Sequence, residues 1–136
     1  MDRNLQILGL SKKAGLLAIG GSDCAAAGKA KKAHIIISAS DASESALRQA
    51  RKSADNGKTL YVQVPYTSFQ IGTVSGRGSP STVAILDLGL ATKFANGLSA
   101  DNPGEYFQIA ETLTLREQAY KRRKRTSTTD IRRTMQ

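Results

Sequence analysis

Short apolar runs along the chain predict the strands of a β-sheet. Ile35, Ile36 and Ile37 form an uninterrupted β-branched run that is too short for a helix, which indicates a strand buried on both faces. Three further apolar or alternating runs predict strands at residues 16–19, 60–64 and 82–86.

Segments with helical spacing of apolar residues lie between and around these strands. They predict helices at residues 4–13, 42–56, 68–74 and 88–96, and a further helix on the small-residue run at 24–27. Strands and helices thus alternate along the chain. This alternation indicates an α/β fold in which helices cover both faces of one sheet, rather than a barrel or a bundle.

The turn before the second helix is the most informative local feature. Gly20 and Gly21 allow a tight turn, and Ser22 or Asp23 is expected to cap the helix that follows. We expect the free amides of the first helical turn to lie beside the lysines that close the same helix, at residues 29–32. Backbone amides next to cations are suited to binding phosphate.

Signals for the third helix are also local. Asp41 and Glu44 have the spacing of a capping box, which places the helix start at about Ala42. Gly57 fits the left-handed residue that commonly ends a helix. We interpret both carboxylates as structural rather than as an acid–base pair.

The C-terminal quarter differs in composition from the rest of the chain. Residues 99–104 read SADNPG and predict a linker, after which residues 105–125 predict a helix that ends in a basic run. We therefore predict one domain at residues 1–98, followed at residues 99–136 by a linker and a basic C-terminal helix or tail. The last residues, 126–136, are expected to fray.

Charge points to a polyanionic partner. The chain of 136 residues carries 20 basic and 11 acidic residues, a formal net charge of +9. Up to Leu98 the balance is 12 against 6, or +6, so the predicted domain is basic by itself. With 3 Phe, 4 Tyr and no Trp, a sheet that reads RNA through an aromatic platform is disfavoured.

Cysteine count and hydropathy indicate a reducing, cytoplasmic compartment. Cys24 is the single cysteine and cannot form an internal disulfide. No apolar run approaches the roughly 20 residues of a membrane span or forms a secretory signal. We expect no membrane association and a monomer.

Candidate catalytic groups are few. One histidine, His34, and one cysteine do not supply a nucleophile with its base and an orienting group, nor the ligands of a metal site. Residues 15–22 have the spacing of a phosphate-binding loop, but Gly21 stands where that motif needs its lysine. The sequence therefore predicts neither an enzyme nor a cofactor.

Four segments resemble a known family. They read LGLSKKAG at residues 8–15, GKAKKAHIIISASDASE at 28–44, FQIG at 69–72 with Gly76, and VAILDLGLA at 83–91. The chain resembles the kink-turn RNA-binding ribosomal protein family L-seven-Ae / L-thirty-e, especially its bacterial branch. The resemblance implies a three-layer α/β/α sandwich with a mixed sheet of about four strands. It also implies an RNA site made by the turn before the second helix and the loop before the last strand.

Family members usually show a glycine, a polar residue, an asparagine, an acidic residue and, three positions on, a lysine at the start of the second helix. The corresponding residues here are Gly20, Gly21, Ser22, Asp23 and Ala26. The glycine and the acid are kept, whereas a hydroxyl replaces the amide and the lysine is absent. Each lost base contact weakens specific recognition by roughly 1–3 kcal/mol.

Two functions from different classes follow. The first is a non-enzymatic RNA-binding protein of the bacterial ribosome or translation apparatus. We expect it to bind structured RNA, such as a kink-turn in ribosomal RNA, through the start of the second helix and its basic flanks. The second is a protein-interaction module that has lost kink-turn recognition and docks on a ribosomal or transcription protein. The candidate RNA-binding residues are Lys12, Lys13, Gly20, Gly21, Ser22, Asp23, Lys29, Lys32, Arg77, Gly78, Ser79, Pro80 and Ser81.

The basic run near the C-terminus allows three interpretations. It is either a solvated helix end whose cations suit the helix dipole, an RNA-clamping tail, or a nuclear address, and the bacterial resemblance of the domain disfavours the last. The family resemblance does not reach this run. Its residues are Lys121, Arg122, Arg123, Lys124 and Arg125.

Overall fold

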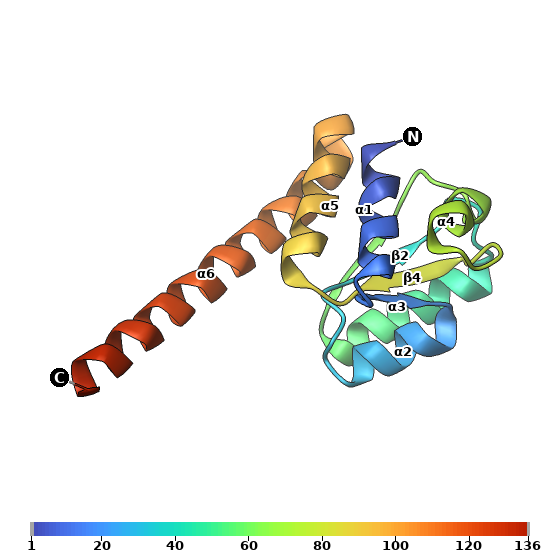
Figure 1. The fold of residues 1–136 in the computed structure, drawn as a ribbon. Coiled ribbons are helices and arrows are strands. Elements are labelled where there is room, and N and C mark those ends of the chain that lie inside the picture. Colours follow the sequence, from blue (N-terminus) through green and yellow to red (C-terminus); the bar gives the residue numbers. More distant parts are fainter. Residues whose placement is uncertain (1, 136) are drawn as a thin grey trace.

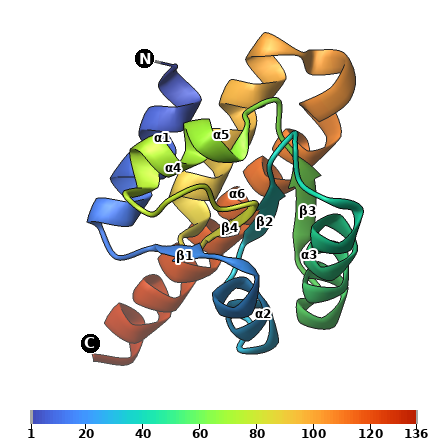
Figure 2. The same ribbon diagram turned by 90° about the vertical axis from the view of Figure 1, so that its right-hand side faces the viewer.

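The computed structural model describes the backbone of residues 2–135 and the side chains of residues 2–124. Helices cover both faces of a four-stranded sheet, which confirms the predicted α/β class and the three layers (Figures 1 and 2). The elements are α1 (Arg3–Lys13), β1 (Leu17–Ile19), α2 (Gly21–Lys29), β2 (Ile35–Ser38), α3 (Glu44–Gly57), β3 (Leu60–Gln63), α4 (Ser68–Ser75), β4 (Thr82–Ile85), α5 (Leu88–Asp101) and α6 (Pro103–Met135).

The sheet is mixed, with the strand order β1-β4-β2-β3. β4 runs antiparallel to both of its neighbours, and its Ile85 lies opposite Leu17 of β1 and Ile35 of β2. β2 and β3 pair in parallel. The ends of β1, β2 and β3 therefore lie at the same edge of the sheet as the start of β4. We call this edge the Thr82 end of the sheet. The opposite end is called the Ile85 end.

Each face of the sheet has its own core cluster. Ile35 and Ile37 pack in the cluster that includes buried side chains of α1, α4, α5 and α6. Ile36 points to the other face. There it packs in a cluster of small side chains from α2 and α3, of which Ala50 of α3 is one. Since all three isoleucines are fully buried, the uninterrupted β-branched run reflects burial on both faces, as expected.

Two glycines let α2 and α3 approach each other at backbone distance. A Cβ on Gly28 would lie 2.8 Å from the carbonyl oxygen of Ser53, and a Cβ on Gly57 would overlap the carbonyl oxygen of Gly28. The prediction that Gly57 takes the left-handed conformation is wrong. Lys58 takes it, with φ 51°, because Gly57 is still helical and lies in the contact with α2.

The predicted capping box of α3 is also wrong. Ser43 caps this helix by accepting a hydrogen bond from the Ala46 amide, so the helix begins at Glu44. Asp41 instead accepts hydrogen bonds from the amide and the hydroxyl of Ser68, at 2.8 and 3.1 Å. Its carboxylate thus ties the loop after β2 to the first residue of α4, and these hydrogen bonds lower its pKa.

The linker expected at residues 99–104 is not observed. α5 continues to Asp101, and α6 begins at Pro103. Asn102 is the single non-helical residue between them. The first half of α6 belongs to the core, where Leu113 is fully buried and Tyr106 donates a hydrogen bond to the Gln63 carbonyl. The backbone of α6 is helical to Met135, so the fraying expected at residues 126–135 is not observed either.

Replacing Gly57 with alanine is expected to lower the free energy of unfolding by about 1–3 kcal/mol, because the new Cβ forces α2 and α3 apart. Urea unfolding followed by circular dichroism measures this change. Gly9→Ala is the matched control: its Cβ would lie 3.5 Å from the nearest atom in mid-helix, so it should be neutral or stabilising by up to about 1 kcal/mol. Equal stabilities of the two variants would contradict the close approach of the helices.

Candidate nucleic-acid interface

The start of α2 lacks the side-chain cap that the other early helices have. Gly20 is the N-cap residue, with φ 95°, and makes no side-chain hydrogen bond. Neither Ser22 nor Asp23 is the cap, because both lie inside the exposed first turn. In α1, α3, α4 and α5 the caps are the side chains of Asp2, Ser43, Thr67 and Asp87. The sequence suggests a side-chain cap here because Ser22, a common N-cap residue type, stands only two residues beyond the true N-cap.

The loop before β4 lies beside this helix start, as the family resemblance implied. The Gly20 amide donates a hydrogen bond to the Thr82 carbonyl at 2.8 Å, which fixes the turn to the start of β4. Arg77 and Asp23 approach to 4.0 Å with both side chains about two-thirds exposed. Such an exposed pair contributes little stability, but it places the two halves of the candidate site next to each other. In the rest of the loop, Gly78 and Ser79 are exposed, and Pro80 and Ser81 are half-buried.

Lys12 and Lys13 precede β1, whose first residue lies opposite Ile85, whereas α2 begins after the other end of β1. Both are exposed at the end of α1 and line a groove of about 520 Å³ between α1 and α4. Gly76, which precedes Arg77, lines the same groove. The structure therefore brings Arg77 next to the start of α2, and Lys12 and Lys13 adjoin this region only along the groove. We call residues 20–23 and residues 77–81 the α2 surface.

Lys29 and Lys32 lie elsewhere. α2 has nine residues and is therefore about 13 Å long, and Lys29 is its last residue. Lys32 precedes His34 by two positions, and the His34 amide donates a hydrogen bond to the Ile85 carbonyl. The expectation that the free amides of α2 lie beside these lysines is thus wrong. The amides face the Thr82 end of the sheet, whereas the lysines lie at the Ile85 end.

The basic residues of α6 form a third group. Lys121, Arg122, Arg123 and Lys124 are exposed, and the side chain of Arg125 lies outside the described residues. This half of α6 extends away from the sheet and the other helices (Figure 1). Lys121 pairs with Glu117 one turn earlier, at 2.9 Å.

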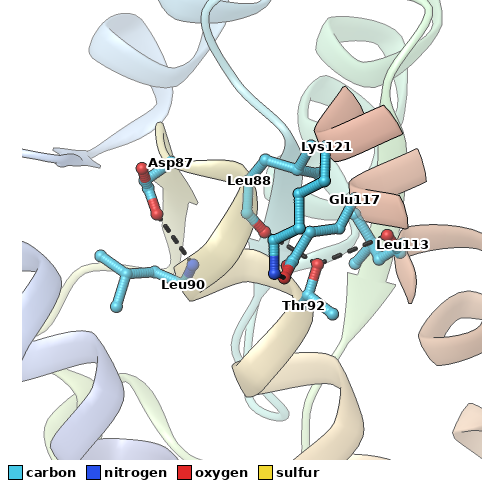
Figure 3. A network of polar contacts seen from close by, with 7 residues as sticks. All are labelled: Asp87, Leu88, Leu90, Thr92, Leu113, Glu117 and Lys121. Atoms are coloured by element: carbon cyan, nitrogen blue, oxygen red, sulfur yellow. Dashed lines mark hydrogen bonds and ion pairs between the residues drawn. The ribbon is translucent and has the colours of Figure 1, made fainter. Parts of the chain in front are cut away.

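A polar network fixes α6 against the start of α5 (Figure 3). Asp87 accepts a hydrogen bond from the Leu90 amide, and Thr92 donates to the carbonyls of Leu88 and Leu113. The hydrogen bond from Lys121 is the main reason that the pKa of Glu117 is lowered. Glu117 therefore stays ionised near neutral pH and orients the lysine at the point where α6 leaves the body of the protein.

Cys24 is unsuited to nucleophilic chemistry. Its side chain is fully buried in the cluster under α2 and α3, and burial raises the pKa of the thiol to about 12. Within residues 2–124 no group of three or more histidine, cysteine or acidic side chains is arranged to hold a metal ion. In the described part of the chain, no helix is both long and apolar enough to cross a membrane.

No protein-family model matches the chain, and no curated protein matches it. Its fold is similar to that of a protein of unknown function from Bacillus halodurans C, with a TM-score of 0.66 and 19% identity. The similarity covers 73% of this chain and 99% of that one. The Giardia lamblia 15.5kD RNA binding protein is also similar, with a TM-score of 0.57 and 13% identity over 71% of this chain and 84% of that one. At these identities the likeness shows the fold alone.

The thiol of Cys24 is expected to resist labelling by a disulfide reagent near pH 8 in the folded protein. With a pKa of about 12 its thiolate fraction is about 1000-fold below that of an ordinary cysteine, and the side chain is enclosed. Labelling in urea should be complete within the usual time for a free thiol. Rapid labelling without denaturant would show that the α2–α3 layer opens readily.

Proposed function

We propose that this protein binds structured RNA through the α2 surface and has no enzymatic activity. The observation that carries the proposal is the uncapped start of α2, which is the one helix among α1 to α5 without a side-chain cap. Its exposed amides and positive dipole end are suited to a phosphate or to an acceptor on a base edge. The similarity in fold to a Giardia lamblia RNA binding protein supports the same reading.

The flanking cations give the surface its electrostatic part. Arg77 is exposed beside the start of α2, and Lys12 and Lys13 are exposed along the adjoining groove between α1 and α4. All three cations are suited to contacting the phosphates of one RNA segment. Ser22 and Asp23, both exposed in the first turn, are then the side chains that we propose to contact bases. With no side chain on Gly21, an RNA strand can approach the backbone closely.

The RNA-reading residues differ from the kink-turn pattern at two exposed positions. Ser22 offers a shorter hydrogen-bonding group than asparagine, and Ala26 lies on the exposed side of α2 without a charge. We therefore propose a moderate preference for kinked RNA over a plain duplex. Because of the resemblance of segments 8–15, 28–44 and 83–91, ribosomal RNA of a bacterial translation apparatus is the proposed partner, bound by a monomer in the cytoplasm.

Arg77→Ala is expected to weaken binding of a kink-turn RNA about three- to tenfold and to lower the salt slope of the affinity by about one, because one phosphate contact is lost. Fluorescence anisotropy at several salt concentrations measures both quantities. Lys52→Ala removes an exposed cation on α3 and should change neither. If the two variants bind RNA equally well, the α2 surface is not the RNA site, and the protein-interaction module becomes the better reading.

Ser22→Asn combined with Ala26→Lys is expected to raise the preference for a kink-turn RNA over a fully paired hairpin by at least about tenfold. The substitutions restore a base-edge amide and a cation at positions that are already exposed. Ala25→Lys alone adds the same charge one residue earlier on the same helix, without the base-edge amide, and should strengthen the binding of both RNAs equally. An equal gain in preference from the double variant and from Ala25→Lys would mean that the geometry of the α2 start does not distinguish the kink.

The exposed arginines of α6 are expected to strengthen binding without selecting a sequence. Arg122→Ala with Arg123→Ala should lower the affinity for kinked and plain RNAs by the same factor and reduce the salt slope by about two. Neither side chain lies in the described core, so the unfolding free energy should stay within about 0.5 kcal/mol of the parent. Unchanged affinity and salt slope would identify this run as a solvated helix end.

A further inference from the structure

A second cavity lies at the Ile85 end of the sheet, away from the α2 surface. It has a volume of about 540 Å³ and is enclosed by three segments: the residue before β2, the turn from β4 into α5, and one face of α6. A cavity of this size is in the range of small-ligand sites. The network of Figure 3 forms part of its wall, so the position of α6 is fixed there rather than left to loops.

Its lining combines apolar, aromatic and acceptor groups. Leu86 and Leu88 supply apolar surface, and Tyr120 contributes an aromatic ring in a residue that is 52% exposed. Asp87 and Glu117 contribute carboxylates. A flat heteroaromatic base fits this combination, because its faces stack on the ring and the leucines while its N–H groups donate to the carboxylates.

His34 adds a group that both donates and accepts hydrogen bonds. Burial is the main reason that its pKa is lowered, with Arg116 acting in the same direction and Asp87 opposing both. The imidazole is therefore neutral near neutral pH. A neutral ring with one donor and one acceptor nitrogen is suited to a base edge rather than to a phosphate.

The rim of the cavity carries positive charge, whereas the charged groups of its interior are carboxylates. Lys121 lines the cavity with a side chain that is 65% exposed, so its ammonium contacts solvent as well as Glu117. Lys124 lines it one turn further on. Lys32 does not line the cavity, but it is two residues from His34, which keeps their Cα atoms within about 7.6 Å. A ligand with an uncharged flat part inside and an anionic part outside satisfies this pattern.

We propose that the cavity at the Ile85 end binds one nucleotide, with the base beside Tyr120 and His34 and the phosphate at the lysine rim. The ligand chemistry has two sources, a free mononucleotide or an unstacked nucleotide in an RNA strand. The second source rests on the RNA binding proposed above. In that case the protein contacts RNA at both ends of its sheet.

The chain has no tryptophan, so Tyr120→Trp introduces a single indole at the cavity, whose emission is separable from that of the tyrosines. Stacking of a base on the indole is expected to quench its emission saturably. Phe107→Trp is the matched control, because Phe107 is 56% exposed on the same helix and does not line the cavity. Both variants are titrated with the four ribonucleoside monophosphates and with single-stranded hexaribonucleotides.

Saturable quenching of Tyr120→Trp by a monophosphate at micromolar concentration, with no tighter binding of the hexamers, identifies a free nucleotide as the ligand. Tighter quenching by the hexamers identifies RNA. Tyr120→Ala in the otherwise unchanged protein should then weaken hexamer binding about tenfold and leave kink-turn RNA affinity within about twofold. Equal quenching of both tryptophan variants, or none up to millimolar ligand, overturns the proposal.

The ring signals of His34 report ligand binding independently, in the protein without substitutions. As the single histidine, it has ring signals in nuclear magnetic resonance spectra that need no assignment, and they should shift with the same midpoint as the quenching. A His34 shift that persists in Arg77→Ala, whose kink-turn binding is weakened, separates this cavity from the α2 surface. If Arg77→Ala loses RNA binding while His34 never shifts in the parent, the proposed function stands and the second site does not.

Discussion

The backbone hydrogen bonds of β4 hold both candidate surfaces in place. At its start, the Thr82 carbonyl accepts from the Gly20 amide, and the Ser81 carbonyl accepts from Ala39. At its end, the Ile85 carbonyl accepts from His34. A strand of four residues therefore positions the turn that begins α2 and, about 10 Å away, the residue that opens the second cavity. Because β4 is paired on both sides and fully buried, neither position moves without breaking the sheet.

The direction of α2 then determines where the positive charge lies. A helix presents its amides at one end and its carbonyls at the other, so lysines that close α2 cannot also surround its start. Lys29 instead lies at the negative end of the helix dipole, which is favourable for a cation. The cation beside the first turn of α2, Arg77, comes from another element, the loop before β4. The basic excess of the sequence is thus divided between the two ends of the sheet.

The strands and most helices could be predicted from the sequence because their signals are local. Three adjacent isoleucines indicate a buried strand wherever they stand, and Thr67 with Gln70 forms a capping box within four residues. The failures involve partners that are distant along the chain. Asp41 has the spacing to cap α3, but its partner is Ser68, 27 residues away. Gly57 has the chemistry of a helix terminator, but its position is decided by contact with Gly28. Residues 99–101 have linker composition, yet they continue a helix whose Leu98 is buried.

α2 begins without the side-chain cap that α1, α3, α4 and α5 have, and this difference affects the stability of the helix. Replacing a capping Ser, Thr, Asn or Asp with alanine destabilises a helix by about 0.5–2 kcal/mol. Replacing it with glycine destabilises the helix by only a few tenths of a kcal/mol. Gly20 therefore keeps the helix stable while leaving the first-turn amides without a side-chain acceptor of their own. Its φ of 95° is strained for any other residue, so a serine or aspartate could not take this place and supply the missing cap. The backbone turn that admits α2 beside β4 thus also keeps its amides open to an external acceptor.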